Sequence, residues 1–142
     1  ELLVSYGNEK IWDVLAENPR NRVVVFGEQP EMLRFPCSTQ SYTDIEGSGG
    51  NFNLSSSPQA LAEFFTFAGV DHIYLGSGYL KPGTDGFRNV TGLLKQGYLS
   101  DLLYENGNGL AVFSPEPREL SAEESEALLA EFTEKYWPGE QQ

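Results

Sequence analysis

The segment from residue 57 to residue 113 constrains the fold most, because it carries the signals of a helix, a strand, a second helix and a β-hairpin in direct succession. Ser57 and Pro58 are residue types preferred at a helix N-cap and at the first helical position. Gly69 can adopt the left-handed conformation that ends many helices. The apolar residues between them recur at helical spacing; they are Leu61, Phe64, Phe65 and Ala68. The apolar run at 72–76 then predicts a buried strand.

A further helix and a hairpin complete this segment. We expect the helix to start at Phe87 or Arg88 and to run to Gln96, with Gly97 ending it. Two apolar strands follow, and residues 106–109 (Asn-Gly-Asn-Gly) connect them. Asparagine and glycine tolerate the positive φ that a tight hairpin turn requires, so these four residues are the predicted turn.

The N-terminal part predicts a helix and a strand. Asn8 is a candidate N-cap for a short amphipathic helix that stops at Asn18, because the residue before a proline avoids the α region. Residues 22–26 (RVVVF) are apolar and β-branched without alternation, which is typical of a parallel strand covered on both faces. In the less regular stretch 28–56 we expect one short polar edge strand within 38–45, followed by a glycine-rich loop.

The C-terminal part predicts one more helix, since Ser121 and Glu124 have the spacing of a capping box. Strands separated by helices require crossovers that are too long for hairpins, and such units form parallel sheets. The fold class is therefore α/β. We predict a small Rossmann-like sandwich, mainly parallel, with an antiparallel C-terminal hairpin. The α/β domain would span 1–114, with a linker and an amphipathic helix packed on it at 115–142.

Composition excludes several classes of partner. The formal net charge is -12 and the isoelectric point is near 4.3. Such a chain offers no basic stripe for phosphates and is repelled by anionic lipid, so we expect no binding to nucleic acid. The single cysteine, Cys37, cannot form an internal disulfide. The chain begins at Glu1, without a signal peptide or an apolar run approaching the roughly 18 residues of a membrane span, and we expect an excised domain of a longer polypeptide.

Four motifs carry a resemblance to a known family. They are RVVVFG (22–27), GVDHIYLG (69–76), LLYENG (102–107) and GLAVF (109–113). In this order the chain, from Trp12 to Phe113, resembles the C-terminal soluble extracytoplasmic domain of bacterial multi-spanning membrane glycosyltransferases of the lipid-phosphate-sugar (mannosyltransferase-like) type. The resemblance implies a place on the extracytoplasmic face of a bacterial cell membrane, beside the membrane-embedded part of the same polypeptide. The family's catalytic carboxylates lie near its first membrane spans, so the resemblance implies no catalytic residue here.

The residues themselves point away from catalysis. His72 opens a predicted buried strand without a neighbouring nucleophile in the sequence, and Cys37 has no histidine partner nearby to activate its thiol. Gly27 and the Gly76–Gly78 loop follow strands, where α/β proteins bind phosphates, but they spell neither a dinucleotide fingerprint nor a Walker loop. The acidic and glycine-rich stretch at 44–51 lacks the ligand pattern of a calcium loop. We therefore expect no catalytic residue, no cofactor and no metal.

Aromatic residues in or near predicted loops are the remaining candidates for ligand contact. Tyr42, Phe52 and Tyr79 could hold a sugar ring by stacking, with polar neighbours supplying hydrogen bonds. The prediction is a non-catalytic extracytoplasmic domain of a membrane glycosyltransferase-like protein that helps to position a glycan or lipid-linked acceptor. Two alternatives stay open: a small nucleotide- or phosphate-binding α/β enzyme that uses the Gly27 and Gly76 loops, and a free-standing interaction module.

Overall fold

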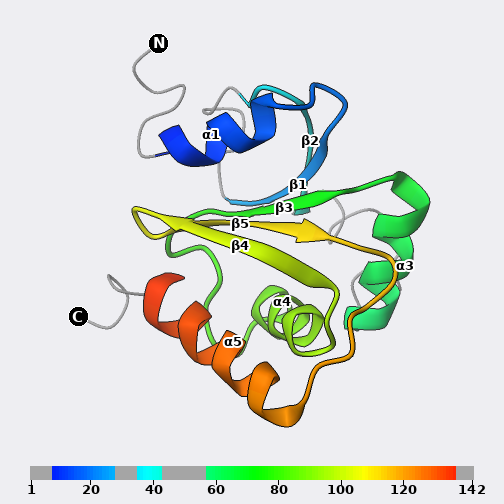
Figure 1. Cartoon of the computed structure of the whole chain (residues 1–142), viewed down its shortest axis with the longest axis vertical. Helices are drawn as coiled ribbons and strands as arrows, with labels where there is room; N and C mark the ends of the chain where they lie inside the picture. Colours follow the sequence, from blue (N-terminus) through cyan, green and yellow to red (C-terminus); the bar gives the residue numbers. More distant parts are fainter. Residues whose placement is uncertain (1–7, 28–34, 43–56, 137–142) are drawn as a thin grey trace.

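The computed structural model describes residues 8–27, 35–42 and 57–136. This part of the chain forms five strands and four helices around one mixed sheet, whose strand order is β2-β1-β3-β5-β4 (Figure 1). The strands are β1 (Arg22–Phe26), β2 (Ser38–Ser41), β3 (His72–Leu75), β4 (Leu99–Glu105) and β5 (Asn108–Phe113). The helices are α1 (Glu9–Ala16), α3 (Pro58–Ala68), α4 (Asp85–Lys95) and α5 (Ala122–Tyr136).

The sheet has a parallel half and an antiparallel half. β1 lies parallel between β2 and β3, with Val24 opposite Ile73. This confirms the prediction that the two apolar strands are central, buried and adjacent. β5 pairs antiparallel with β3, and β4 pairs antiparallel with β5 at the edge. The polar strand β2 forms the opposite edge, also as predicted. The α/β class is therefore confirmed.

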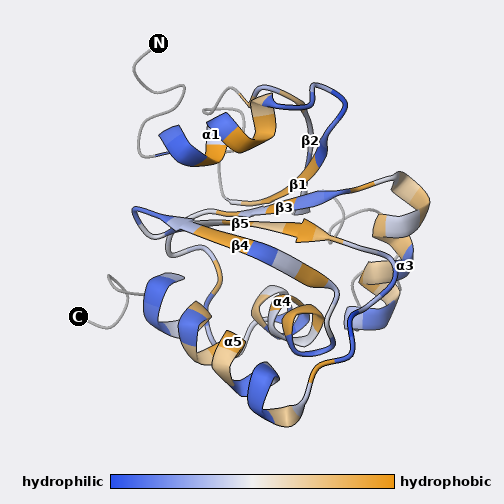
Figure 2. Cartoon of the chain, viewed as in Figure 1, coloured by the Kyte–Doolittle hydropathy of each residue, from blue (hydrophilic) through white to orange (hydrophobic). Residues whose placement is uncertain are grey.

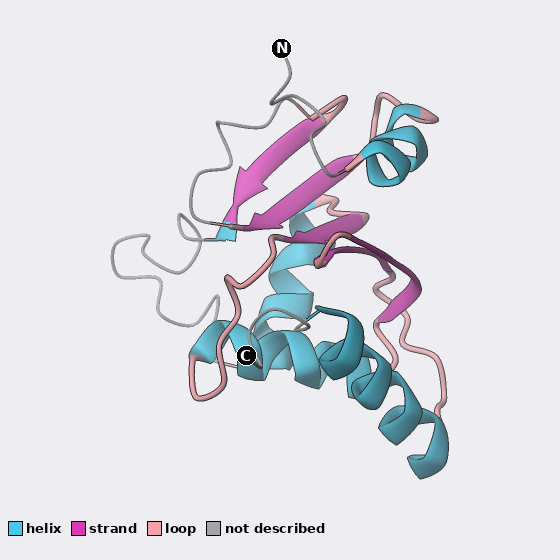
Figure 3. Cartoon of the chain, turned by 90° about the vertical axis from the view of Figure 1, so that its left-hand side faces the viewer, coloured by secondary structure: helices cyan, strands magenta, loops and turns pink. Residues whose placement is uncertain are grey.

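Alternating side chains of β1 pack on the two faces of the sheet. Val24 and Phe26 belong to the core shared with α3, α4 and α5. Val23 and Val25 pack with α1 on the other face. The strand β1 is therefore covered by apolar clusters on both faces, and its ribbon is mainly apolar in colour (Figure 2). The sheet separates α1 from the other three helices (Figure 3). A strand covered on both faces needs an unbroken apolar run, which explains the sequence of β1.

Two helix ends follow the predicted capping chemistry. Ser57 Oγ accepts a hydrogen bond from the backbone N of Ala60 at 3.1 Å, and Gly69 ends α3 with φ 75°. Ser121 and Glu124 form the predicted capping box of α5: Glu124 N donates to Ser121 Oγ at 3.0 Å, and Ser121 N donates to the Glu124 carboxylate at 2.8 Å. These local signals position both helices.

Three predicted details are wrong. α4 begins at Asp85, earlier than expected, because Thr84 Oγ1 caps it by accepting from Phe87 N at 3.2 Å. The hairpin turn is shorter than expected: only Asn106 and Gly107 have positive φ and form it, while Asn108 already belongs to β5. The third concerns the start of α1.

Helix α1 is capped from across the molecule rather than by Asn8. The Asn8 side chain makes no cap hydrogen bond; its Oδ1 instead accepts from Tyr74 Oη at 3.1 Å and from Asn108 Nδ2 at 3.0 Å. The carboxylate of Glu105, at the end of β4, accepts from the backbone N of Lys10 at 2.9 Å and of Ile11 at 3.1 Å. A carboxylate is favoured at this end of a helix by the helix dipole. The cap therefore couples α1 to the hairpin.

Candidate functional site

The carboxyl ends of β1 and β3 lie side by side, at the place where open α/β sheets usually bind ligands. Gly76 N donates to the carbonyl O of Phe26 at 2.8 Å. A Cβ atom at Gly76 would lie 3.2 Å from that oxygen and 3.6 Å from the Cα of Gly27. The two glycines that the sequence singled out are thus neighbours in space, and Gly76 allows the close approach of the two strand ends.

Four backbone N–H groups at the end of β3 and in the loop after it donate hydrogen bonds within the domain. Ser77 N donates to Asn108 Oδ1 at 2.8 Å, and Tyr79 N donates to Gly76 O at 3.1 Å. Leu80 N donates to Tyr136 Oη at 3.1 Å, and that hydroxyl donates in turn to Gly76 O. A phosphate site in such a loop needs N–H groups that point at the ligand. Here these four N–H groups, that of Gly76 included, are bonded to protein oxygens.

A small hollow of about 270 Å³ lies beside this loop, and it brings two of the predicted ligand-contacting residues together. It is lined by Tyr42, Tyr79, Leu80, Thr84 and Gly86. Tyr42 is only 1% exposed; its ring stacks on Phe26, with centroids 4.3 Å apart, and its Oη accepts from Asn89 Nδ2 at 3.2 Å. Tyr42 is therefore a core side chain at the floor of the hollow, whereas Tyr79 is half-buried at its side.

Phe52, the third predicted ligand-contacting residue, lies outside the described residues, as does the acidic and glycine-rich stretch at 44–51. Within the described ranges, no group of three or more histidine, cysteine, aspartate or glutamate side chains could hold a metal ion.

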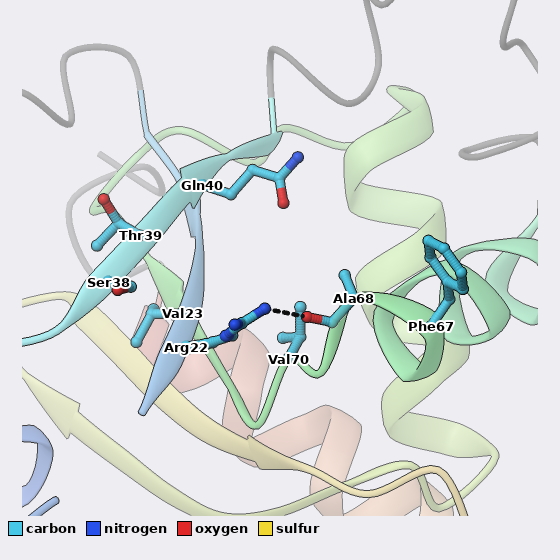
Figure 4. Close-up of a pocket in the computed structure, with 8 residues that line it drawn as sticks. All are labelled: Arg22, Val23, Ser38, Thr39, Gln40, Phe67, Ala68 and Val70. Carbon is cyan, nitrogen blue, oxygen red and sulfur yellow. Dashed lines mark hydrogen bonds between the residues drawn. The ribbon is translucent and has the colours of Figure 1, made fainter. Parts of the chain in front are cut away.

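A larger cavity, of about 390 Å³, opens between the edge strand β2 and the C-terminal end of α3 (Figure 4). Arg22 crosses it and donates from Nη1 to the carbonyl O of Ala68 at 2.9 Å. Phe67 stands at its rim and is 88% exposed. The lining is completed by Val23, Ser38, Thr39, Gln40 and Val70.

Sequence reasoning missed this second cavity, because its walls come from three segments that are far apart along the chain. One signal was available. Phe67 falls outside the inward stripe of α3 that Leu61, Phe64, Phe65 and Ala68 define, so the helical spacing places a large aromatic ring on the exposed side.

Cys37 lies in an environment that does not activate a nucleophile, and His72 is nearly buried beside Asp71. His72 is 9% exposed, and its Nδ1 lies 2.7 Å from the Asp71 carboxylate. The same carboxylate accepts from the backbone N of Arg22 at 3.0 Å, so it joins the starts of β1 and β3. Burial, and then the negative charge of Asp71, raise the pKa of the Cys37 thiol to about 11. A catalytic thiol requires the opposite shift.

The thiol of Cys37 should therefore react slowly with iodoacetamide. At pH 8 we expect a labelling rate roughly two orders of magnitude below that of an unhindered thiol, because the thiolate fraction is correspondingly small. The rate should rise about tenfold per pH unit until the pH nears the pKa, which intact-protein mass spectrometry can follow. Fast labelling at pH 7 would contradict this environment for Cys37.

The pKa values of two tyrosines, the buried Tyr74 and the partly buried Tyr104, are raised away from neutral pH. Burial raises the pKa of Tyr74 to about 12, although the hydrogen bond to Asn8 acts in the opposite direction. Burial and the charge of Glu131 raise the pKa of Tyr104, whose Oη is buried without a hydrogen-bond partner among the described residues. Neither phenol is poised as an acid or base near pH 7.

None of the described helices combines the length and the apolar character needed to cross a bilayer. Comparison of the chain with protein-family models, with curated proteins and with solved structures finds no match.

Proposed function

We propose that this chain is a non-catalytic extracytoplasmic domain of a bacterial membrane glycosyltransferase-like protein. It is a Rossmann-like sandwich that packs on the membrane-embedded part of the same polypeptide and helps to position a glycan or lipid-linked acceptor. The order of elements supports this proposal: the motifs that carry the resemblance occupy β1, β3, β4 and β5 of one sheet.

One observation carries the proposed non-catalytic role: backbone N–H groups of the loop after β3 are already hydrogen-bonded within the domain. In a nucleotide-binding α/β protein this loop presents free N–H groups to a phosphate. Here oxygens of the domain itself accept these hydrogen bonds in place of a phosphate. Tyr136 Oη accepts from Leu80 N and donates to Gly76 O, and Asn108 Oδ1 accepts from Ser77 N. The alternative of a phosphate-dependent enzyme would require these contacts to be broken.

The reading frame that encodes this chain tests the membrane-protein part of the proposal. We expect several hydrophobic spans to be encoded before Glu1. A start codon directly upstream, without such spans, would contradict the proposal and favour the free-standing interaction module.

The side of the membrane can be tested with the full-length protein in intact cells. Glu123 is exposed on α5, so Glu123→Cys offers an accessible thiol to a membrane-impermeant maleimide. We expect Glu123→Cys to be labelled in intact cells, whereas the parent, which retains the weakly reactive Cys37, gives only background signal. Labelling that occurs only after lysis would place the domain on the cytoplasmic side.

A further inference from the structure

Phe67 is the one aromatic side chain among the described residues that is almost fully exposed, at 88%. Among the described residues, Val14 is the other exposed large hydrophobic residue, at 36%. Phe65, two positions earlier in α3, is completely buried. The ring of Phe67 thus contributes little to the core, and it stands at the rim of the larger cavity (Figure 4). A flat apolar face beside a polar cavity is suited to stacking against a ligand ring.

The floor of the cavity carries polar groups on the same side of the sheet as Phe67. Arg22 and Ser38 are register partners on β1 and β2, and Gln40 lies two residues further along β2, on the same face. Ser38 and Gln40 are exposed, and no described residue makes a hydrogen bond with either side chain. Hydroxyl and amide groups in this arrangement can donate to and accept from the hydroxyls of a sugar.

The guanidinium group of Arg22 is only partly used by the domain. Its Nη1 donates to Ala68 O, whereas among the described residues none accepts from Nε or Nη2 and no carboxylate forms an ion pair with the guanidinium. Nε and Nη2 together form the edge of a guanidinium that binds a carboxylate with two parallel hydrogen bonds. The carboxylate of Asp71, next to the start of β1, accepts from the backbone N of Arg22 and lies beside His72.

The acidic C-terminal part of the chain lies away from this cavity. Seven glutamates lie between residues 116 and 134, where Arg118 is the one basic residue. The helix α5 that carries most of them lies at the far end of the sheet from β2 (Figure 1). Screening over about 8 Å at physiological salt weakens their effect on an anion at Arg22.

We propose that the cavity between β2 and α3 binds a hexuronate unit of a saccharide. One face of the pyranose ring stacks on Phe67, the carboxylate pairs with Nε and Nη2 of Arg22, and ring hydroxyls bond Gln40 and Ser38. A volume of about 390 Å³ accommodates one such ring. This inference deepens the proposed role in acceptor positioning and rests on it, since it names the sugar class and the residues that would contact it.

The test is an NMR titration of the ¹⁵N-labelled 142-residue chain with methyl β-D-glucuronide, using methyl β-D-glucoside as the neutral counterpart. We expect saturable shifts at the amides of 22–23, 38–40 and 67–70, with a dissociation constant in the millimolar range. The glucoside should bind about tenfold more weakly, since it lacks the charge-assisted pair with Arg22.

Three variants locate the site. Phe67→Ala should weaken binding about fivefold, and Arg22→Lys, which keeps the charge but loses the paired donors, about tenfold. Val14→Ala, which truncates an exposed apolar side chain of α1 on the opposite face of the sheet, should leave binding unchanged. Absence of saturable shifts, shifts centred on Tyr42 and Tyr79, or equal binding of the two glycosides would each overturn the proposal. None of these outcomes affects the reading-frame test or the labelling test in cells. The proposed function can therefore fail or stand independently of the saccharide site.

Discussion

Replacing Phe65 by alanine is expected to lower the free energy of unfolding by about 3–5 kcal/mol. Phe65 is completely buried, and its ring meets that of Phe113 edge-on with centroids 5.3 Å apart, so it joins α3 to β5. Truncation removes the transfer free energy of the ring and leaves a cavity that the surrounding sheet cannot close. Urea denaturation followed by circular dichroism measures the loss.

Phe67→Ala is the matched control, since it makes the same chemical change in the same helix at an 88% exposed position. We expect it to change stability by less than about 0.5 kcal/mol. Similar losses for Phe65→Ala and Phe67→Ala would contradict the orientation of α3 on the sheet, and with it the position of Phe67 at the rim of the cavity.

Replacing Gly97 by alanine is expected to cost about 2–5 kcal/mol. Gly97 has φ 91°, and a Cβ atom there would lie 2.1 Å from the carbonyl O of Arg118. That backbone cannot move away freely. Arg118 N donates to Gly97 O at 2.9 Å, and its Nη2 donates to Leu99 O at 2.7 Å. The substitution should therefore loosen the segment that leads into α5, which thermal unfolding would detect.

Gly83→Ala separates backbone strain from the steric clash. Gly83 has nearly the same φ, 89°, but nothing lies within 4 Å of a Cβ atom at that position. We expect a loss of only about 1 kcal/mol from the left-handed conformation. If the two glycine variants lost the same stability, the close packing of residue 118 against residue 97 would be wrong.

Much of the fold could be predicted because its signals are local. The unbroken apolar run of β1, the Ser57-Pro58 start of α3, Gly69 at its end and the Ser121 capping box each depend on residues within one or two turns. Such signals act through short-range hydrogen bonds and burial, so the sequence alone expresses them.

The errors arose where a distant segment competes with the local signal. Asn8 has the residue type of an N-cap, but its side chain is taken by Tyr74 and Asn108, and Glu105 caps the helix instead. Tyr42 lies directly after the polar strand β2, and nothing in the local sequence indicated that its ring would stack on Phe26 of the neighbouring strand. The cavity at Arg22 escaped prediction for the same reason, since no single segment contains its lining.

Isothermal titration of the domain with mononucleotides, dinucleotides and inorganic phosphate tests the non-catalytic role most directly. Because Tyr136 and Asn108 already bond the loop after β3, we expect no detectable binding of any of these ligands at micromolar concentrations. Gly76→Ala, which crowds the ends of β1 and β3, should then change stability without changing the titration. Micromolar affinity for a nucleotide, lost in Gly76→Ala while the variant stays folded, would contradict the proposed function and establish the phosphate-dependent alternative.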